Sequence, residues 1–396
     1  MDWRVKGLYT NYYEIDMKNM TIHIIYENYL NPNGEGISVG GIQTYITNLI
    51  SVFLEIELGV VIHQRADTNF EKIINNGTVR VYGYRYTGSI RRFPQYLFNN
   101  AIEHIDKQKD IILFGTDSLI CDSKGYKTLA IQHGVFWDKP QPYCSNVKYL
   151  VEYLKQSYRA WRTIKTIRKV DRLICVDYNF VNWYRALVAF PQITLRVIPN
   201  FSVIEQLPQK SNKIIKIIFA RRLFLYRGTR IFASAVKKLL KLELPIDVTI
   251  AGEGPDEDYL KQLFKDNHNV HFIKYDSTES LAIHSDKDIA VIPTVGSEGT
   301  SLSLLEAMSA KCAVICSNVG GMTNIVLNRY NGIMINPNEQ ELFQALLELI
   351  NNHELRQELS IKAQETVAKA FSLELWQKEW RRVIKEVLSD IACESN

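Results

Sequence analysis

The chain has 396 residues, of which 46% are hydrophobic and 23% are charged, and its formal net charge is +4. This length predicts two domains of about 200 residues, each large enough to bury its own core. The small positive charge does not indicate a nucleic-acid binder. No apolar segment follows the first charged residues, and no run of about 18 uncharged apolar residues occurs, so we expect a cytosolic protein.

The six cysteines contain no C-x-x-C pair. Three of them, Cys175, Cys312 and Cys316, lie in apolar runs that resemble strands. This placement predicts buried thiols in a reducing compartment, with neither disulfides nor a cysteine metal site.

The N-terminal half begins with a polar segment of about 20 residues, followed by a predicted strand over 21–26. A turn-rich loop then leads to Gly40 and Gly41, which open a helix. Such a turn is often only a tight connection, but its backbone amides can also approach an anion. Strand-like runs alternate with helical segments from 60 to 130, which indicates a parallel α/β domain.

Two segments of this half carry possible binding residues. Residues 84–93 mix arginines with aromatic side chains, which fits either an acceptor-binding loop or a solvated loop. The strand over 128–132 ends at His133 and Gly134. A lone histidine is usually structural, but ligands of open α/β sheets bind at the carboxyl ends of the strands.

Residues 147–170 read as one long helix with seven basic residues, one acidic residue (Glu152) and several aromatic residues. This composition suits a surface of anionic lipid, and it equally suits a helix with a solvated basic face. A second α/β alternation begins at Ile214 after a polar linker over 208–212. Its first strand is followed by Arg221, Arg222 and Arg227.

The most informative stretch is a predicted strand over 289–293, a loop of small residues and a helix. Glu298 precedes this helix and Glu306 lies about two turns along it, so the two carboxylates cannot form an acid/base pair on one face. Glu306 suits the hydroxyls of a ribose, and Glu298 suits a second polyol. The small residues Gly299, Thr300 and Ser301 allow a diphosphate to approach the helix N-terminus.

Two D-x-D sequences occur, Asp256-Glu257-Asp258 and Asp286-Lys287-Asp288. The first opens a helix, where acidic residues are favoured without a metal, and the second directly precedes a buried strand. We therefore expect no metal site at either.

The last third of the chain resembles the retaining glycosyltransferases of family 4. Their pattern of a strand, P-S-x-x-E-G, E-A-M, a second strand, G-G and a later G is matched in order by Pro293, Glu298, Gly299, Glu306, Ala307, Met308, Gly320, Gly321 and Gly332. The sequence departs from the family at three places. Lys311 stands where the family usually has Gly, and Thr300-Ser301 stand in a segment that often contains Phe and Gly. Phe201 replaces the Gly that ends the family's V-I-P-N-G segment.

The resemblance implies the GT-B architecture, an α/β fold of two Rossmann-like domains facing across a cleft. It implies an acceptor-side domain over 1–206, a nucleotide-sugar domain over 207–372 and a terminal helix over 373–396 that crosses back to the first domain.

The resemblance also implies site residues. His133, Glu298, Arg222 and Arg227 would be catalytic, with Arg222 matching the arginine of the family's G-R-L-x-x-x-K-G and Arg227 replacing its lysine. The donor would contact Gly40, Gly41, Gly252, Gly299, Thr300, Ser301 and Glu306.

The implied reaction transfers a sugar from a UDP- or GDP-linked donor to a hydroxyl of a glycan or lipid-linked acceptor, with retention and with neither metal nor cofactor. It fits cell-surface polysaccharide or glycolipid synthesis, and the basic helix fits a peripheral position on the inner membrane face. Two alternatives stay open: a non-catalytic scaffold subunit, and another enzyme on the same fold, such as a nucleotide-sugar epimerase or a phosphorylase.

Overall fold

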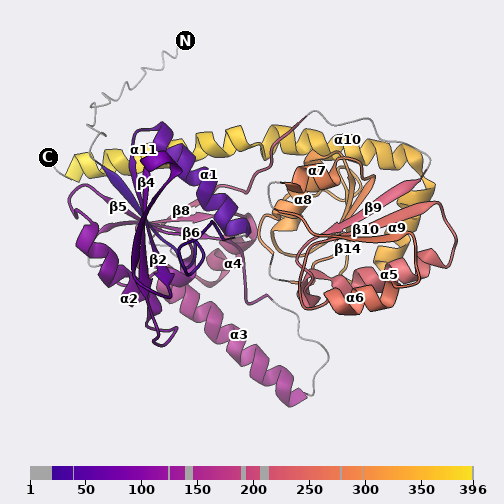
Figure 1. Cartoon of the computed structure of the whole chain (residues 1–396), viewed down its shortest axis with the longest axis horizontal. Coiled ribbons are helices and arrows are strands. Elements are labelled where there is room, and N and C mark those ends of the chain that lie inside the picture. The colour runs from indigo at the N-terminus through magenta and orange to yellow at the C-terminus, as the bar shows by residue number, and fades with distance from the viewer. Residues whose placement is uncertain are drawn as a thin grey trace, which may run out of the picture.

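The computed structural model of the chain describes residues 20–38, 40–123, 125–138, 146–188, 193–205, 214–276, 279–296 and 298–394. The predicted N-terminal extension and the 208–212 linker lie outside these residues. Two parallel sheets, each flanked by helices, stand side by side (Figure 1). None of the helices in the described part is long and apolar enough to cross a bilayer.

The N-terminal sheet has eight strands in the order β3-β4-β2-β1-β5-β6-β7-β8, parallel except for the antiparallel β3–β4 pair. Its strands are β1 Thr21–Ile25, β2 Gly59–Ala66, β3 Phe70–Ile74, β4 Val79–Arg85, β5 Ile111–Phe114, β6 Lys127–Gln132, β7 Arg172–Cys175 and β8 Thr194–Val197. Its helices are α1 Gly41–Glu55, α2 Phe93–Ala101, α3 Asn146–Ile167 and α4 Tyr178–Leu187. The central strands are almost wholly buried, which explains their continuous apolar sequences.

The C-terminal sheet has six parallel strands in the order β11-β10-β9-β12-β13-β14. They are β9 Ile215–Ala220, β10 Ile246–Ala251, β11 Val270–Ile273, β12 Ile289–Ile292, β13 Ala313–Ser317 and β14 Ile333–Ile335. The helices are α5 Thr229–Leu240, α6 Glu257–Phe264, α7 Ser280–His284, α8 Leu302–Ser309, α9 Glu339–Asn351 and α10 His353–Ala370. The strand order reverses between β9 and β12, and ligands of such sheets bind beyond the carboxyl ends of the strands at this point.

The last helix, α11 (Leu373–Glu394), continues from α10 and returns to the N-terminal domain (Figure 1). Its apolar residues, including Trp376, Trp380 and Val383, lie in the same core as α1 and the N-terminal sheet. Two arginines of that sheet pair with its acidic face, because Arg172 and Arg196 both contact Glu386. The second domain is therefore connected to the first by a helix that the first domain buries.

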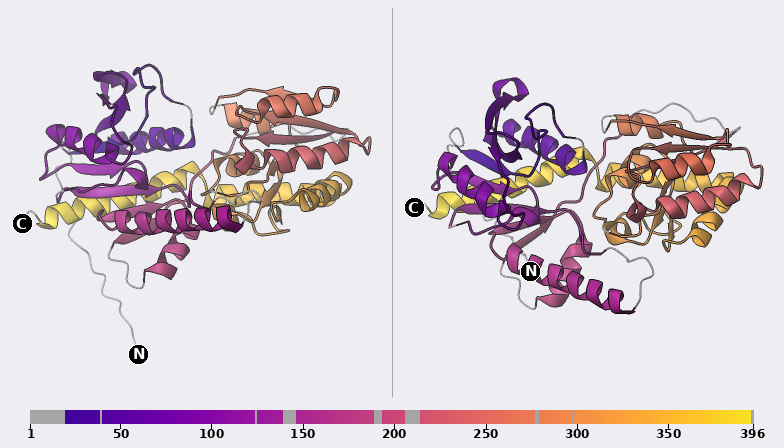
Figure 2. Two further views of the ribbon diagram at one scale, coloured as in Figure 1. Left: turned by 90° about the horizontal axis from the view of Figure 1, so that it is seen from below. Right: turned by 60° about the horizontal axis from the view of Figure 1, so that its bottom comes forward.

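Helix α3 projects from the N-terminal domain (Figure 1 and the right view of Figure 2), and only its last part, with Ala160, Ile164 and Ile167, packs against that domain's core. Its N-terminal two thirds carry large apolar side chains that are 45% to 73% exposed. They are Val147, Tyr149, Leu150, Val151, Tyr153, Leu154, Tyr158 and Trp161. This helix is the part of the described structure where the most large apolar side chains face outward.

Candidate functional site

The candidate site is built around the loop between β12 and α8, which contains Glu298. Although it lies in a loop, Glu298 is only 8% exposed. Its Oε2 accepts hydrogen bonds from Nη2 of Arg221 at 2.6 Å and from Oγ1 of Thr294 at 3.1 Å. Nη1 of Arg227 donates to the same oxygen. Burial alone would raise the pKa of Glu298, but the two guanidinium groups outweigh it and hold the pKa below its ordinary value.

Arg221, rather than Arg222, reaches Glu298. Arg221 directly follows β9 and is only 5% exposed, and its Nη1 also donates to Oγ1 of Thr294. Arg222 is exposed, and its guanidinium carbon lies 5.6 Å from the ring centre of Phe224. The structure thus does not bring Arg222 to the other predicted site residues, whereas Arg227 does join them.

Two glycines allow other backbone segments to approach Arg221 and Glu298 closely. Gly252 has φ +126°, and a Cβ there would collide with the carbonyl oxygen of Arg221. Gly320 has φ +55°, and a Cβ there would collide with the carbonyl oxygen of Glu298. The next residue, Gly321, donates its N–H to that same oxygen at 3.1 Å. Both positions need glycine to hold the segments that carry Arg221 and Glu298.

Glu306 lies on α8 and is partly buried. Oγ of Ser280 donates to its Oε2 at 2.5 Å. Burial raises the pKa of this carboxyl, while the hydrogen bond from Ser280 and the charge of Arg221 act in the opposite direction. Glu298 and Glu306 are therefore two separate carboxylates that share the electrostatic influence of one arginine.

His133 follows β6 in the N-terminal domain. Its Nε2 lies 3.0 Å from the carbonyl oxygen of Gly115. A carbonyl only accepts, so Nε2 carries the proton and Nδ1 is left as an acceptor. Burial lowers the pKa of His133 to about 4, so the ring is neutral at pH 7.

The backbone after His133 contacts the Glu298 loop directly. A Cβ on Gly134 would lie 2.8 Å from the backbone nitrogen of Gly299, and a Cβ on Gly299 would lie 2.7 Å from the carbonyl oxygen of His133. The two domains thus meet where both have glycine, and the predicted residues His133, Glu298 and Gly299 come together from the two halves of the chain.

Hydrogen bonds join the two domains around this contact. Oγ1 of Thr300 donates to the carbonyl of Val176, and Nδ2 of Asn200 donates to the carbonyl of Thr300 at 2.6 Å. Ser301 instead caps α8, since its Oγ accepts from the N–H of Leu304. The side chains of Thr300 and Ser301 are therefore used within the protein in this arrangement.

The N-termini of two helices face each other at the same place. A Cβ on Gly41, the first residue of α1, would lie 3.1 Å from Cδ1 of Leu302, the first residue of α8. Gly40 precedes α1 and offers no side-chain cap. The loop that contains Glu298 leads directly into α8, so the positive ends of both helix dipoles lie beside this loop, which favours a bound anion.

Asp177 is a further buried residue of this junction, and the sequence patterns did not single it out. Its Oδ1 caps α4 by accepting from the N–H of Phe180 at 2.9 Å, and its Oδ2 is buried without a hydrogen-bond partner. Burial, together with the negative charge of Glu298, raises the pKa of Asp177 to about 6. Its place directly after a buried strand and before a helix was the available signal.

Both D-x-D sequences have local partners. Asp256 accepts from Thr229 and Arg230, and Asp286 pairs with Lys216 and Lys287. Within the residues that the structure describes, no group of three or more His, Cys, Asp or Glu side chains is placed to hold a metal ion.

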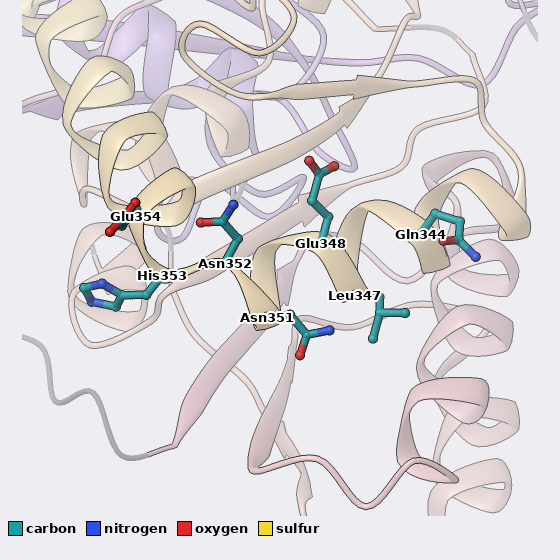
Figure 3. A pocket seen from close by; sticks show the side chains of 7 residues that line it. All are labelled: Gln344, Leu347, Glu348, Asn351, Asn352, His353 and Glu354. Atoms are coloured by element: carbon teal, nitrogen blue, oxygen red, sulfur yellow. The ribbon is translucent and has the colours of Figure 1, made fainter.

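A surface hollow of about 740 Å³ lies elsewhere, at the junction of α9 and α10 (Figure 3). It is lined by Gln344, Leu347, Glu348, Asn351, Asn352, His353 and Glu354. Glu348 already pairs with Arg329, and Asn352 caps α10. Two of its polar residues thus serve local structure, and the hollow shares none of its lining with the Glu298 site.

Comparison with protein families finds a match in the C-terminal half of the chain. Residues 202–366 match the family model described as glycosyl transferases group 1. An uncharacterized glycosyltransferase of Methanocaldococcus jannaschii is 25% identical over 281 residues, which cover 67% of this chain and 70% of that protein. The poly(ribitol-phosphate) alpha-N-acetylglucosaminyltransferase of Staphylococcus aureus is 26% identical over 190 residues, 46% of this chain and 38% of that protein.

Solved structures extend the likeness to both domains. Sucrose-phosphate synthase of Thermosynechococcus elongatus superposes with a TM-score of 0.74 at 15% identity, covering 94% of this chain and all of that one (100%). Anabaena HepE in complex with UDP superposes with a TM-score of 0.65 at 14% identity, covering 93% and 100%. The predicted α/β fold of GT-B type is confirmed, and the comparisons support a group 1 glycosyltransferase.

Proposed function

We propose that the protein transfers a sugar from a nucleoside diphosphate sugar to a hydroxyl group, with retention at the anomeric carbon and without a metal ion. The observation that carries this proposal is the junction of Glu298 with Arg221 and Arg227 beside the facing N-termini of α1 and α8. A site with two buried or half-buried guanidinium groups and two helix N-termini suits a diphosphate.

Each part of the donor then has a partner. The diphosphate contacts Arg221, Arg227 and the amides at Gly40 and Gly41. The carboxylate of Glu306 accepts hydrogen bonds from the ribose, and that of Glu298 from the transferred sugar. Gly252 borders the base. Compared with the sequence-based assignment, Arg221 takes the place of the exposed Arg222 because only Arg221 faces Glu298.

The proposed chemistry occurs on one face of the sugar. The bond between the anomeric carbon and the phosphate oxygen breaks, the acceptor oxygen bonds to the same face, and the acceptor proton passes to the departing phosphate oxygen. The two guanidinium groups offset the charge that develops on the diphosphate. His133 lies beside the sugar as a neutral ring, with Nδ1 available to accept a hydroxyl hydrogen.

We propose a UDP- or GDP-linked donor and an acceptor of the cell surface, a glycan or a lipid-linked glycan. The complex of HepE with UDP supports a uridine donor. The Staphylococcus aureus relative and an Escherichia coli relative called an O-antigen biosynthesis glycosyltransferase support a surface glycan. The seven basic residues and exposed aromatic side chains of α3 support a cytoplasmic enzyme that docks on anionic lipid at the inner membrane face.

The experiment that tests the reaction is proton NMR of the purified protein with UDP- and GDP-sugars and a panel of glycan and lipid-linked acceptors, with EDTA present. Formation of a glycosidic product whose anomeric configuration equals that of the donor supports the proposal. An inverted product, or activity that EDTA abolishes, contradicts the mechanism. Conversion of the nucleotide sugar into its epimer favours an epimerase, and nucleotide binding without any turnover favours a scaffold subunit.

A further inference from the structure

The chain crosses between the domains twice, and the two crossings are joined to each other. The N–H of Ser202 donates to the carbonyl of Phe371 at 2.9 Å, and the N–H of Leu373 donates to the carbonyl of Ser202 at 3.2 Å. Residues 202 and 371–373 thus form a hydrogen-bonded hinge.

Phe201 stands at the hinge, at the position where the similar family has glycine. Its side chain is buried, and its ring centre lies 4.5 Å from that of Trp376 in the first turn of α11. Trp376 is itself only 3% exposed. This chain therefore places a bulky ring between the hinge and α11, where a glycine would leave a gap.

The contact continues from Trp376 to His133 through one more ring. Trp376 meets Tyr45 of α1 edge to face, with ring centres 5.0 Å apart and planes at 89°. Tyr45 meets His133 in the same way, at 5.2 Å and 87°. Nε1 of Trp380 donates to the hydroxyl of Tyr45 at 2.9 Å, which fixes the phenol ring.

His133 is thereby held on two sides. Its Nε2 donates to the carbonyl of Gly115, and its ring lies against Tyr45. Edge-to-face contacts depend on orientation, and close-packed rings cannot turn without moving their neighbours. The direction in which Nδ1 of His133 points is therefore coupled, ring by ring, to the position of Phe201.

We infer that Phe201, Trp376 and Tyr45 are positioning residues that couple the interdomain hinge to the orientation of His133 in the cleft. This inference rests on the proposed sugar transfer, in which His133 lies beside the donor sugar. We call these three residues the aromatic row. In the proposed site the aromatic row acts on the geometry of the reacting sugar, and none of its residues contacts the nucleotide.

The test uses Phe201→Gly, which restores the family's residue and empties the space, Phe201→Leu, which refills part of it, and Tyr45→Phe, which removes the hydroxyl that accepts the bond from Trp380. We expect kcat of Phe201→Gly to fall about ten- to hundredfold, because small misplacements of reacting groups have effects of this size. The KM for the donor should change less than about threefold, and Phe201→Leu should recover part of kcat. The ring signals of His133 in ¹⁵N NMR should shift in Phe201→Gly and Tyr45→Phe.

The matched control is Phe98→Leu. Phe98 is a fully buried ring of the same core that contacts Phe114 and Tyr126 instead of the aromatic row. We expect this variant to lose stability while kcat and the His133 signals stay as in the unsubstituted protein. Equal effects of Phe201→Gly and Phe98→Leu on kcat and on the His133 signals would overturn the inference.

The outcome can be separated from that of the proposed function. If the unsubstituted protein neither binds a nucleoside diphosphate nor transfers a sugar, the proposed function fails, and the NMR comparison still decides whether the row holds His133. If the protein is active and the ring signals of His133 do not change in the Phe201 variants, only the proposed coupling between the hinge and His133 fails. Should Phe201→Gly not fold, Phe201→Leu and Tyr45→Phe decide the question by the same two measurements.

Discussion

Nη2 of Arg221 lies 2.6 Å from Oε2 of Glu298, with side chains 4% and 9% exposed. Arg227 contacts the same carboxylate oxygen. One acidic group thus pairs with two basic groups in a largely buried position, which keeps both guanidinium groups in place. In the proposed site a diphosphate takes over the two guanidinium groups, and its arrival would release Glu298 to contact the sugar.

Replacing Arg221 with alanine should weaken both folding and donor binding. Breaking a buried ion pair typically costs about 3–5 kcal/mol, and we expect the lower end because Arg227 and Thr294 remain on Glu298. The loss of charge-assisted hydrogen bonds to phosphate should raise the Kd for a nucleoside diphosphate roughly ten- to hundredfold. Urea unfolding and isothermal titration calorimetry measure the two effects.

The control is the neighbouring Arg222→Ala, which removes an exposed guanidinium and should change stability by no more than about 0.5 kcal/mol. Equal loss of nucleotide binding in the two variants would refute the assignment of Arg221. A larger loss in Arg222→Ala would reinstate the residue that the sequence motif selected.

Glu306→Gln should weaken nucleotide binding through the ribose. The substitution keeps the shape of the side chain and the bond with Ser280 can persist, but the charge-assisted bonds to ribose hydroxyls are lost. We expect the Kd for the ribonucleotide to rise about tenfold or more. A nucleotide without ribose hydroxyls should bind both forms equally, and Glu358→Gln, an exposed position on α10, should bind as the unsubstituted protein does. If Glu306→Gln raises the Kd for the ribonucleotide and for the nucleotide without ribose hydroxyls equally, Glu306 does not contact the ribose.

His63 should contribute a loss of stability in mild acid. This ring is fully buried and is stacked with His23, Tyr82, Tyr84 and His104. Burial, together with the neighbouring histidines His23 and His104, lowers its pKa well below the ordinary value. The unfolded chain takes up a proton below about pH 6.5 and the folded protein does not, so His63 should lower the free energy of unfolding by about 1.4 kcal/mol per pH unit below that value.

Urea unfolding between pH 7.5 and 5 measures this slope, and His63→Gln should make it shallower. Asp117 acts with the opposite sign, because burial raises its pKa to about 7 and the folded protein then holds a proton that the unfolded chain has lost. The difference between the two proteins therefore isolates His63. Identical slopes would show that His63 is not buried as a neutral ring.

Helix α3 should bind anionic membranes. We expect sedimentation with vesicles containing phosphatidylglycerol at low salt, loss of binding at high salt, and little binding to vesicles of neutral lipid. Replacing Lys155, Arg159 and Arg162 with glutamate should abolish sedimentation without changing the unfolding transition, since all three side chains are exposed. Failure of the unsubstituted protein to sediment with the anionic vesicles would remove the membrane proposal.

Much of the fold was predictable because its central strands are fully buried and therefore read as apolar runs between glycine-rich turns. The junction of Glu298 with the His133 segment could not be predicted, since it depends on how two domains meet. Arg221 was missed because the motif was aligned on Arg222 and Leu223, and because β9 is buried on both faces, so alternation along the strand does not show which arginine faces Glu298. The roles of Thr300 and Asp177 are likewise set across the domain contact, which no local pattern records.

The central claim is tested most directly by thermal unfolding of the protein with a panel of nucleoside mono- and diphosphates and nucleotide sugars in the presence of EDTA. We predict that one nucleoside diphosphate and its sugars raise the Tm, and that the shift is reduced in Glu306→Gln and Arg221→Ala but kept in Arg222→Ala. A Tm that no nucleotide changes, or a shift that survives in Arg221→Ala and Glu306→Gln alike, would contradict a donor site at Glu298.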